Sequence, residues 1–452
     1  MSDSDTQAYQ SVKDYLQRAD YGRLKALLEP LHSADIADIL GDLANEEKVI
    51  VLKQLANEKA AEVLAVVDDH SGQALLELLT DSEVVSLLEE MPSDDAADII
   101  STLPPEKSKQ VDALLPSLER EKLYELLEFE EDTAGGIMEV EKVAVREQAT
   151  IRDAIELVRK LADQIENVED VYVVDHSGKL IGHIPVLDLI LHEPEEKVTD
   201  VMVDTVTTVP VDMDQEEVAN LFGKYDEFTL PVIDDEGKLV GRITVDDIID
   251  VIEEEASEDI ARIAGTVEGE IGETSPIKIS RARLPWLIFA LLGQMVNALI
   301  MSQYATSIET ALALVFFVPL VIGTAGGTGI QAAVVVVREI AVGEVSTAHI
   351  GKRILRELQV TFVNGLILGA ILFGVVMLWR TEIALGLLLW STLLTVTIVA
   401  AFMGASIPLL MNRTRVDPAI ATGPFITVMS DIVGLLIYMA FATYYVSRLH
   451  TQ

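Results

Sequence analysis

An aspartate stands in the middle of an apolar stretch near the C-terminus, TVMSDIVGLLIYMAF, residues 427–441. A charged side chain at the centre of a bilayer costs at least ~2.5 kcal/mol, so a carboxylate at such a position needs a reason. No Lys, Arg or His lies at comparable depth in any apolar stretch, so a buried ion pair has no partner. On a helix, Asp431 shares one face with small or oxygen-bearing residues, namely Gly423, Thr427, Gly434 and Tyr438. The pattern predicts a carboxylate that binds a cation.

A second apolar stretch, VPLVIGTAGGTGIQAAV at 318–334, is rich in glycine and contains Pro319. These residues predict a break or kink in the middle of a membrane helix, where unpaired backbone is tolerated only against protein or a watery cavity. Freed carbonyls, the hydroxyls of Thr324 and Thr328 and the amide of Gln331 would then offer neutral oxygens to a cation. The alternative is close helix packing through small residues, and the two interpretations are compatible.

One carboxylate with neutral oxygens is typical of hard cations. Mg²⁺ keeps several of its waters and is contacted through one or two carboxylates, whereas transition metals favour His or Cys. The chain has no Cys, and none of its seven His residues lies in an apolar segment. A single Asp provides too few charged ligands to bind a divalent ion on its own. A symmetric homodimer with this helix at its axis would bring two together.

The sequence offers five apolar segments of about 20 residues or more, enough to cross ~30 Å of hydrocarbon. We expect them near 284–304, 310–337, 358–379, 384–410 and 419–446. The flanks assigned to one side carry Lys278, Arg281, Arg283, Arg338, Lys352, Arg353, Arg356, Arg413 and Arg415, and the opposite flanks carry only Arg380 and Arg448. Positive charge stays inside, which predicts a multi-pass protein with a cytoplasmic N-terminus and an outside C-terminus.

The charge of the chain is strongly divided. The first 275 residues hold 67 acidic and 22 basic residues, a net charge of −45, while the other 177 hold 7 acidic and 11 basic residues. Such an acidic region excludes nucleic acid and favours divalent cations as partners, although adaptation to high salt would also produce it. No P-loop, His-Glu-x-x-His helix or nucleophile elbow is present, so we do not expect an enzyme.

Two internal repeats organise the acidic region. LLEPLHSADIADILGDL (27–43) matches LLEEMPSDDAADIISTL (87–103) at an offset of 60, which predicts stacked short helices. VYVVDHSGKLIGHIPVLDLI (171–190) matches LPVIDDEGKLVGRITVDDII (230–249) at an offset of 59. Each copy reads as a β-α-β-β-α unit, and the tandem pair resembles a pair of CBS domains. The segment EASEDIARIAGT (255–266) continues as a helix toward the membrane, either to transmit a gating motion or as a plain linker.

The whole arrangement resembles the MgtE family of Mg²⁺ channels and transporters. The sharpest matches are PLVIGTAGGTGIQ (319–331) and DPAIATGPFITVMSDIVGLLIY (417–438). The resemblance implies a homodimer in membrane lipid whose pore lies on the dimer axis, with Asp431 binding hydrated Mg²⁺ and Asp417 on the cytoplasmic side. The implied pore set is Asp431, Asp417, Gly327, Thr328, Gln331 and Thr427. Family members more usually have Asn in place of Thr328, which leaves selectivity open.

The resemblance also implies a regulatory Mg²⁺ site that closes the pore. Its matching residues here are Asp94, Asp98, Asp246, Asp247, Asp250, Glu255, Glu258 and Asp259. Glu255 and Asp259 are i,i+4 neighbours whose like charges repel, so a divalent cation would stabilise that helix face. A solvated acidic surface is the alternative for each residue. CBS pairs can also bind adenine nucleotides, and no residue here decides this.

The sequence therefore predicts a multi-domain protein. Its expected parts are an all-α helical-repeat domain (1–132), a tandem CBS pair (133–253, divided near 200), a connecting helix (254–280) and a membrane domain of five transmembrane helices (281–452). The predicted function is Mg²⁺ uptake across the plasma membrane, the inner membrane of a bacterium. Two alternatives stay open: a broader carrier for Co²⁺, Mn²⁺ or Ni²⁺, and a membrane-anchored CBS sensor without transport.

Overall fold

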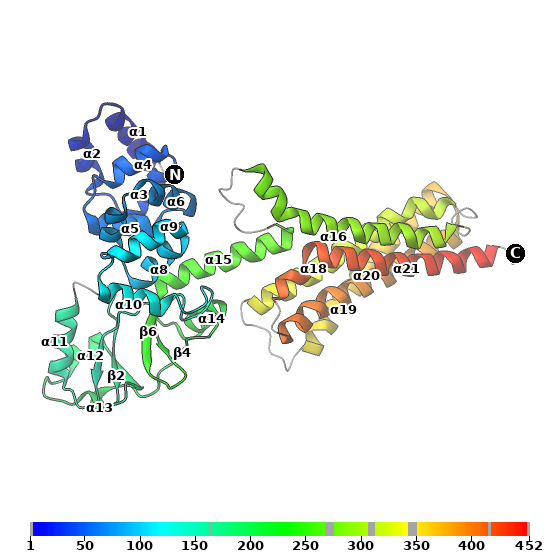
Figure 1. The fold of residues 1–452 in the computed structure, drawn as a ribbon. Helices are drawn as coiled ribbons and strands as arrows, with labels where there is room; N and C mark the ends of the chain where they lie inside the picture. Colours follow the sequence, from blue (N-terminus) through cyan, green and yellow to red (C-terminus); the bar gives the residue numbers. More distant parts are fainter. Residues whose placement is uncertain are drawn as a thin grey trace. The chain divides into compact units, whose positions relative to one another are not determined.

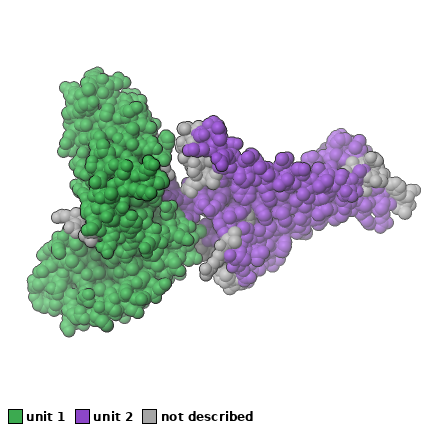
Figure 2. Space-filling model, viewed as in Figure 1, with its two compact units in different colours: residues 1–252 green, residues 253–452 purple. Residues whose placement is uncertain are grey.

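The computed structural model describes residues 3–449 apart from 163–164, 166, 267–274, 306–311, 342–349 and 415–416. Arg415, the start of the second predicted span and residues 267–274 of the predicted connecting helix therefore lie outside the described residues. The chain divides into two compact units, residues 1–252 and 253–452, which Figure 2 colours separately. We describe each unit by itself.

The first part of unit 1 is a stack of short helices (Figure 1). They are α1 (Asp3–Gln17), α2 (Tyr21–Leu28), α3 (Ser33–Gly41), α4 (Asn45–Leu52), α5 (Asn57–Val66), α6 (Asp69–Leu78), α7 (Asp81–Leu88), α8 (Ser93–Thr102), α9 (Pro105–Leu114) and α10 (Ser117–Leu126). Alternate helices pack on one another, as in α3 on α5 and α8 on α10. None of them can bury its apolar face alone, so the stack shares one continuous core.

The second part of unit 1 contains two small sheets of the same design. The first comprises β1 (Ala144–Arg146), α11 (Ile151–Leu161), β2 (Asp170–Val174), β3 (Leu180–Pro185), α12 (Val186–Leu191) and α13 (Val198–Val201). The second comprises β4 (Val209–Pro210), α14 (Gln215–Tyr225), β5 (Thr229–Ile233), β6 (Leu239–Thr244) and the start of α15 (Val245–Ala264). In both, the first strand runs parallel to the second, and the second and third form an antiparallel hairpin. The predicted β-α-β-β-α repeat is confirmed.

The hairpin turns explain why the two sequence copies share an Asp-x-x-Gly pattern. Asp175 Oδ1 accepts hydrogen bonds from the backbone N–H groups of Ser177 (2.8 Å) and Lys179 (3.0 Å), and Asp234 plays the same part in the second copy. Gly178 and Gly237 have φ angles of +89° and +78°, a region that favours glycine. The core of the helical stack continues into the second sheet, through residues such as Val232 and Ile243.

The described residues of unit 2 form five helices that are long and apolar enough to cross a membrane. The elements are α16 (Pro276–Gln303), η2 (Leu312–Phe317), α18 (Val318–Ala341), α19 (Ile350–Trp379), α20 (Ile383–Arg413), η4 (Pro418–Ala421) and α21 (Gly423–Leu449). Large apolar side chains such as Leu291 and Ile371 are more than half exposed, as expected for helices that face lipid. The predicted fold class is confirmed.

The predicted break in the second span is wrong. The helix α18 runs without interruption from Val318 through all four glycines of the segment to Ala341. Pro319 is the second residue of α18, where a missing N–H group costs nothing. The Thr324 and Thr328 hydroxyls donate to the carbonyls of Leu320 and Thr324, each over 2.8 Å, in ordinary i−4 bonds. The segment frees no backbone carbonyls, and its glycines instead allow close approach.

Candidate functional site

Asp431 lies on the helix α21 and reaches a cavity of about 550 Å³ between α16, α18 and α21. Its side chain is largely buried, with 9 % of the residue exposed. Gly326 of α18 faces it closely, because a Cβ atom there would lie 3.5 Å from Asp431 Oδ1. Gly323, Gly327 and Thr427 line the same cavity. The glycines thus bring a helix backbone next to a membrane carboxylate and leave space beside it.

A neutral amide, rather than a basic residue, is the hydrogen-bond partner of this carboxylate. Gln294 on α16 donates from Nε2 to Asp431 Oδ2 over 2.8 Å. Asn297, one turn further on, donates from Nδ2 to Gln294 Oε1 over 3.2 Å, and its own buried Oδ1 meets no donor in the described part of the chain. This hydrogen bond from the Gln294 side-chain amide orients one oxygen of the Asp431 carboxylate. Because the amide is neutral, it does not cancel the negative charge of the carboxylate. The sequence reasoning missed both residues, although two amides at i,i+3 in an apolar segment were a usable signal.

The predicted pore residues divide between different places in unit 2. Gly327 and Thr427 share the cavity of Asp431. Thr328 and Gln331 line a separate cavity of about 320 Å³ between α18, α19 and α20. Asp417 caps the short helix η4 by accepting a hydrogen bond from the N–H of Ala419 over 2.7 Å. The structure brings together three of the six predicted residues.

The end of α15 packs tightly against the segment that begins α21. Arg262 forms ion pairs with Glu258 on its own helix and with Asp417. Gly423 has a φ of +47°, and a Cβ atom there would lie 2.2 Å from the carbonyl oxygen of Ile263. This contact leaves no room for any other residue at position 423.

Acidic residues accumulate around the same contact. Burial, followed by the charges of Asp417 and Glu255, raises the pKa of Asp259 to about 6. Arg262 opposes this rise with its positive charge. The predicted regulatory residues Glu255, Glu258 and Asp259 thus lie on the part of α15 that belongs to unit 2.

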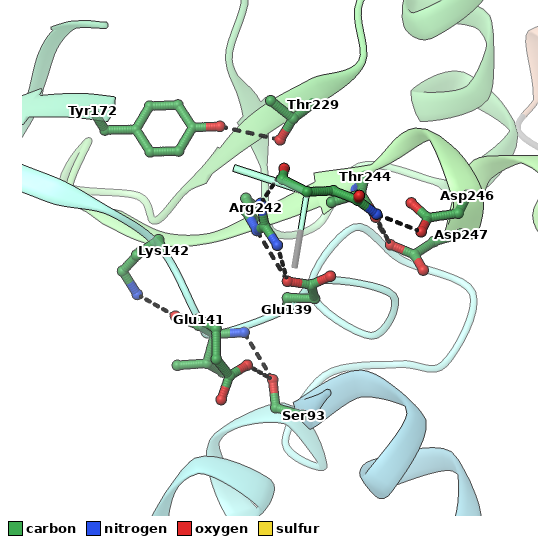
Figure 3. Close-up of polar contacts among 12 residues, drawn as sticks. Ser93, Glu139, Glu141, Lys142, Tyr172, Thr229, Arg242, Thr244, Asp246 and Asp247 are labelled. Carbon is green, nitrogen blue, oxygen red and sulfur yellow. Dashed lines mark hydrogen bonds and ion pairs between the residues drawn. The ribbon is translucent and has the colours of Figure 1, made fainter. Parts of the chain in front are cut away.

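In unit 1, a second group of carboxylates lies where the helical stack meets the second sheet. Asp94 on α8, Glu139 in the following connection and Asp247 on α15 each place one oxygen within 4.8 Å of the others. Figure 3 shows Glu139 beside Arg242, to which it is bonded over 2.7 Å and 2.9 Å, and Asp247 beside Thr244. The Thr244 hydroxyl donates to Asp247 Oδ2 over 2.6 Å. These bonds hold two of the three carboxylates in place.

Ser93 connects this group to the helical stack. Its hydroxyl donates to Glu141 over 2.6 Å, as Figure 3 shows. The same oxygen accepts a hydrogen bond from the N–H of Val140 over 2.9 Å. Lys122 pairs with Glu141 on the other side over 2.9 Å. The connection that carries Glu139 is therefore fixed against α8, which carries Asp94.

The carboxylates of this group repel one another. Burial, followed by the charges of neighbouring acids, raises the pKa of Asp247 to about 6 and that of Asp95 to about 7. Burial also raises the pKa of Glu139 to about 7, although Arg242 lowers it in part. Burial and the charge of Asp247 raise the pKa of Asp94 well above its usual value. Asp94 Oδ1 has no hydrogen-bond partner among the described residues. A divalent cation bound between these carboxylates would relieve their mutual repulsion and stabilise their ionised form.

The predicted regulatory residues of unit 1 fall in or around this group. Asp94 and Asp247 belong to it, whereas Asp98 lies near Glu131 and Asp247. Asp246 and Asp250 follow along α15 and contribute negative charge to the surroundings of Asp95. The sequence reasoning missed Glu139, and no motif marks it, because its partner Arg242 is 103 residues away.

Comparison with known proteins matches most of the chain to family models. A family model described as the MgtE intracellular N domain matches residues 31–132, and CBS-domain models match 134–194 and 198–254. A third model, MgtE, described as a divalent cation transporter, matches residues 318–441. The magnesium transporter MgtE of Enterococcus faecalis is 38 % identical over 327 residues, 72 % of each chain. The chain belongs to the MgtE family.

Other relatives support the same family assignment. The magnesium transporter MgtE of Thermus thermophilus is 37 % identical over 325 residues, again 72 % of each chain. A crystal structure of the cytosolic domain of the Mg²⁺ channel MgtE in complex with ATP matches with a TM-score of 0.52 and 37 % identity, over 54 % of this chain and 99 % of that one. The soluble part of a magnesium transporter matches with a TM-score of 0.52 and 30 % identity, over 56 % and 99 %. The family is one of membrane transporters.

Proposed function

We propose that this protein carries Mg²⁺ across the plasma membrane and that Asp431 contacts the ion. The observation that carries the proposal is the arrangement of Asp431 itself. A carboxylate among membrane helices, bonded to the neutral amide of Gln294 and open to a cavity of about 550 Å³, keeps its charge available for a cation. The names of the relatives, which are magnesium transporters, support the choice of ion.

The lining of the cavity favours a hydrated ion. Mg²⁺ dehydrates reluctantly and is usually held through one or two carboxylates with several waters retained. The cavity has room for roughly ten or more waters, at about 30 Å³ of liquid volume each. Gly323, Gly326 and Gly327 add space and Asn297 adds an amide. Broader transport of Co²⁺, Mn²⁺ or Ni²⁺ is the alternative, although no His among the described residues lines the cavity.

We also propose that the working unit is a homodimer. Gly323, Gly327 and Gln331 follow one another at intervals of four on α18 and are exposed in the single chain. Nothing lies within 4 Å of a Cβ atom at either glycine among the described residues. A stripe of small and polar residues of this kind suits a helix–helix contact better than lipid. A second copy would also supply a second Asp431.

The acidic groups support a proposal of regulation by cytoplasmic Mg²⁺. Asp94, Glu139 and Asp247 in unit 1 gather oxygens that repel one another when no cation is bound. Asp98, Asp246 and Asp250 add negative charge around them, and Glu255, Glu258 and Asp259 form the corresponding acidic face in unit 2. We propose that Mg²⁺ bound by these residues favours a closed pore, through α15 and its contact with Asp417.

Three further parts of the proposal concern the orientation of the chain in the membrane, nucleotide binding and domain division. The bias of basic residues supports a cytoplasmic N-terminus and an outside C-terminus. A relative's cytosolic domain was crystallised with ATP, which supports an adenine nucleotide as a ligand of the CBS pair. We also propose the four-part division at 1–132, 133–253, 254–280 and 281–452.

Ion flux into proteoliposomes tests the function. We expect Mg²⁺ uptake by the wild type and a loss of at least about tenfold in Asp431→Asn, which keeps the shape and the acceptor for Gln294 but removes the charge. Glu382→Gln is the matched control, because this carboxylate bonds only to Tyr445 at a helix end among the described residues, over 3.3 Å. Undiminished flux in Asp431→Asn would remove this residue from the pore. Absence of flux in the wild type would favour the CBS sensor, and equal competition by Co²⁺, Mn²⁺ or Ni²⁺ would favour the broader carrier.

A further inference from the structure

The cavity between α18, α19 and α20 is separate from the Asp431 cavity and has a different chemistry. The two share no lining residue. Its volume is about 320 Å³, and its lining is polar for a site between membrane helices. The polar residues are Thr328 and Gln331 from α18, Glu357, Thr361 and Asn364 from α19, and Thr397 from α20. Thr361 and Thr397 are buried, Thr328 and Glu357 are half-buried, and Gln331 and Asn364 are exposed. A cavity that places two buried hydroxyls and a half-buried carboxylate between membrane helices suits a polar occupant.

The Thr328 and Thr397 hydroxyls of this cavity donate their hydrogens to backbone carbonyls of their own helices. Thr328 Oγ1 donates to the carbonyl of Thr324 over 2.8 Å, and Thr397 Oγ1 donates to the carbonyl of Leu393 over 2.9 Å. A hydroxyl has one hydrogen and two lone pairs, so each of these oxygens retains only acceptor capacity toward the cavity. The amides of Gln331 and Asn364 each add a carbonyl oxygen with two lone pairs and an NH₂ group with two donors, so acceptor sites still outnumber donors. The lining therefore presents an excess of acceptors, which suits a cation.

The charge of the cavity is small and is partly neutralised. The Glu357 side chain is only 15 % exposed, and its Oε2 accepts a hydrogen bond from Arg353 Nη1 over 3.2 Å. Arg353 also pairs with Glu339, so the three residues carry one net negative charge. No hydrogen bond or ion pair within the described part of the chain involves Glu357 Oε1. One carboxylate oxygen is left for the cavity beside a fixed guanidinium.

We propose that this cavity binds a monovalent alkali cation, held by Glu357 and the neutral oxygens of Thr328, Thr397 and Gln331. A single net negative charge balances a monovalent ion. Mg²⁺ demands an octahedral shell that it usually completes with waters and carboxylates, whereas neutral hydroxyl and amide oxygens satisfy Na⁺ or K⁺ with less strain.

The helix α18 gives such an ion a means to affect transport. Gly323, Gly326 and Gly327 face the Asp431 cavity, while Thr328 and Gln331 on the same helix line the second cavity. Occupancy of the second cavity would therefore bias the position of a helix that forms the first. The proposal does not depend on Asp431 or on Mg²⁺ transport, so the two can fail separately.

Binding of radioactive sodium and of radioactive rubidium, as a stand-in for potassium, tests the site on the purified full-length protein in choline buffer without Mg²⁺. We expect saturable binding of at least one of the two ions to the wild type. Glu357→Gln should weaken it at least about tenfold. Thr397→Val, which keeps the shape of a residue that is 1 % exposed and removes one oxygen, should weaken it several-fold. Glu382→Gln should bind as the wild type does.

The melting temperature provides a second readout, because an ion that binds only the folded state stabilises it. The wild type should melt at a higher temperature in sodium or potassium chloride than in choline chloride at equal ionic strength, and Glu357→Gln should lose this difference. A variant that melts like the wild type in choline is folded, so its loss of binding counts for the site. Absence of saturable binding of both ions in the wild type would overturn the proposal, as would undiminished binding in both cavity variants.

Discussion

Gln294 on the first membrane helix donates a hydrogen bond to Asp431 on the fifth, with Nε2 and Oδ2 2.8 Å apart. The bond joins two helices that are 137 residues apart in the sequence. The hydrogen bond holds one oxygen of the carboxylate in place and leaves its negative charge uncompensated. An Arg or Lys in the same position would neutralise that charge. A carboxylate held in this way remains an acceptor for a cation, which distinguishes it from an acid buried for structural reasons.

Replacement of Gln294 should impair Mg²⁺ flux while Asp431 is intact. A hydrogen bond to a charged group contributes about 1.5–3 kcal/mol, so we expect Gln294→Leu to lower flux by about tenfold or more. Gln303→Leu is the matched control, because Gln303 is exposed at the end of the same helix. Flux in proteoliposomes measures both. Equal flux in the two variants would show that the amide does not position the carboxylate.

Gly423 should be intolerant of any side chain. Its φ of +47° costs an alanine about 1–2 kcal/mol, and a Cβ atom would also meet the carbonyl of Ile263 at 2.2 Å. We expect Gly423→Ala to loosen the contact between α15 and α21 and to leave flux that persists at high internal Mg²⁺. Gly374→Ala should behave as the wild type, because nothing lies within 4 Å of a Cβ atom there. Normal closure in Gly423→Ala would exclude this contact from gating.

The two copies of the sheet unit provide a control for the carboxylate group of unit 1. Asp247 and Asp188 occupy equivalent positions 59 residues apart, but only Asp247 lies near Asp94 and Glu139. We expect Asp247→Asn to raise the Mg²⁺ concentration needed for protection against trypsin by about tenfold, since one of three clustered carboxylates is lost. Asp188→Asn should leave it unchanged. The same shift in both variants would place the Mg²⁺ effect elsewhere.

Acid pH should weaken the same Mg²⁺ response. The pKa of Asp247 is raised to about 6 and that of Glu139 to about 7, so both bind protons in the folded state over a range where they would be ionised if unfolded. Without Mg²⁺, this contribution to stability is present below about pH 4 and is lost as the pH rises through 6 to 7. Protons and Mg²⁺ compete, so the Mg²⁺ requirement should increase as the pH falls from 7.5 to 5.5, by up to about tenfold per unit for each proton displaced.

Hydrogen exchange of peptides from α8 is the suitable measurement for this pH dependence. The three tryptophans of the chain, Trp286, Trp379 and Trp390, all lie in unit 2, so their fluorescence does not report on unit 1. The sequence repeat supplies the control, because α3 is the equivalent helix and lies away from the carboxylate group. Mg²⁺ protection of α8 that does not change between pH 5.5 and 7.5 would contradict the assignment.

The fold was largely predictable because its signals are local and repeated. The offset of 59 marks two equal sheet units, each with an Asp-x-x-Gly hairpin, and five long apolar segments mark the membrane helices. The break expected in α18 failed for a local reason as well. Pro319 was read as an interior residue, but η2 precedes it and places it in the first turn.

The candidate sites were predictable only where a residue was unusual in its own segment. Asp431 and the acids of α15 met this condition. Glu139 is not unusual in its own segment. Its place in the site depends on the ion pair with Arg242, 103 residues later, and on the packing of α8 nearby. The division of α18 between two cavities was likewise hidden, since Gly327 and Thr328 are adjacent in sequence and only the packing of α16, α19 and α21 decides which cavity each one lines.

Arg262 should help to keep the pore closed when Mg²⁺ is present. Its guanidinium pairs with Glu258 and Asp417 at once, and each of these side chains is about one-third exposed. Partly exposed ion pairs contribute up to about 1 kcal/mol, so we expect Arg262→Gln to raise residual flux at high internal Mg²⁺ by up to about fivefold. The residual flux of Arg262→Lys should be intermediate, because a lysine ammonium is a single point charge, whereas the guanidinium can pair with Glu258 and Asp417 at the same time.

The effect of Arg262→Gln should also depend on pH. Without the guanidinium, Asp259 and Asp417 repel, and this repulsion requires both to be ionised. In the wild type the pKa of Asp259 is raised to about 6, chiefly by burial and then by the charge of Asp417, and the loss of Arg262, whose charge lowers this pKa, raises it further. Acidification from pH 8 toward pH 5 therefore protonates Asp259 and removes the repulsion. The excess flux of Arg262→Gln should therefore be largest at pH 7 to 8 and should shrink toward pH 5. An excess that is independent of pH would mean that Arg262 acts through packing rather than through charge.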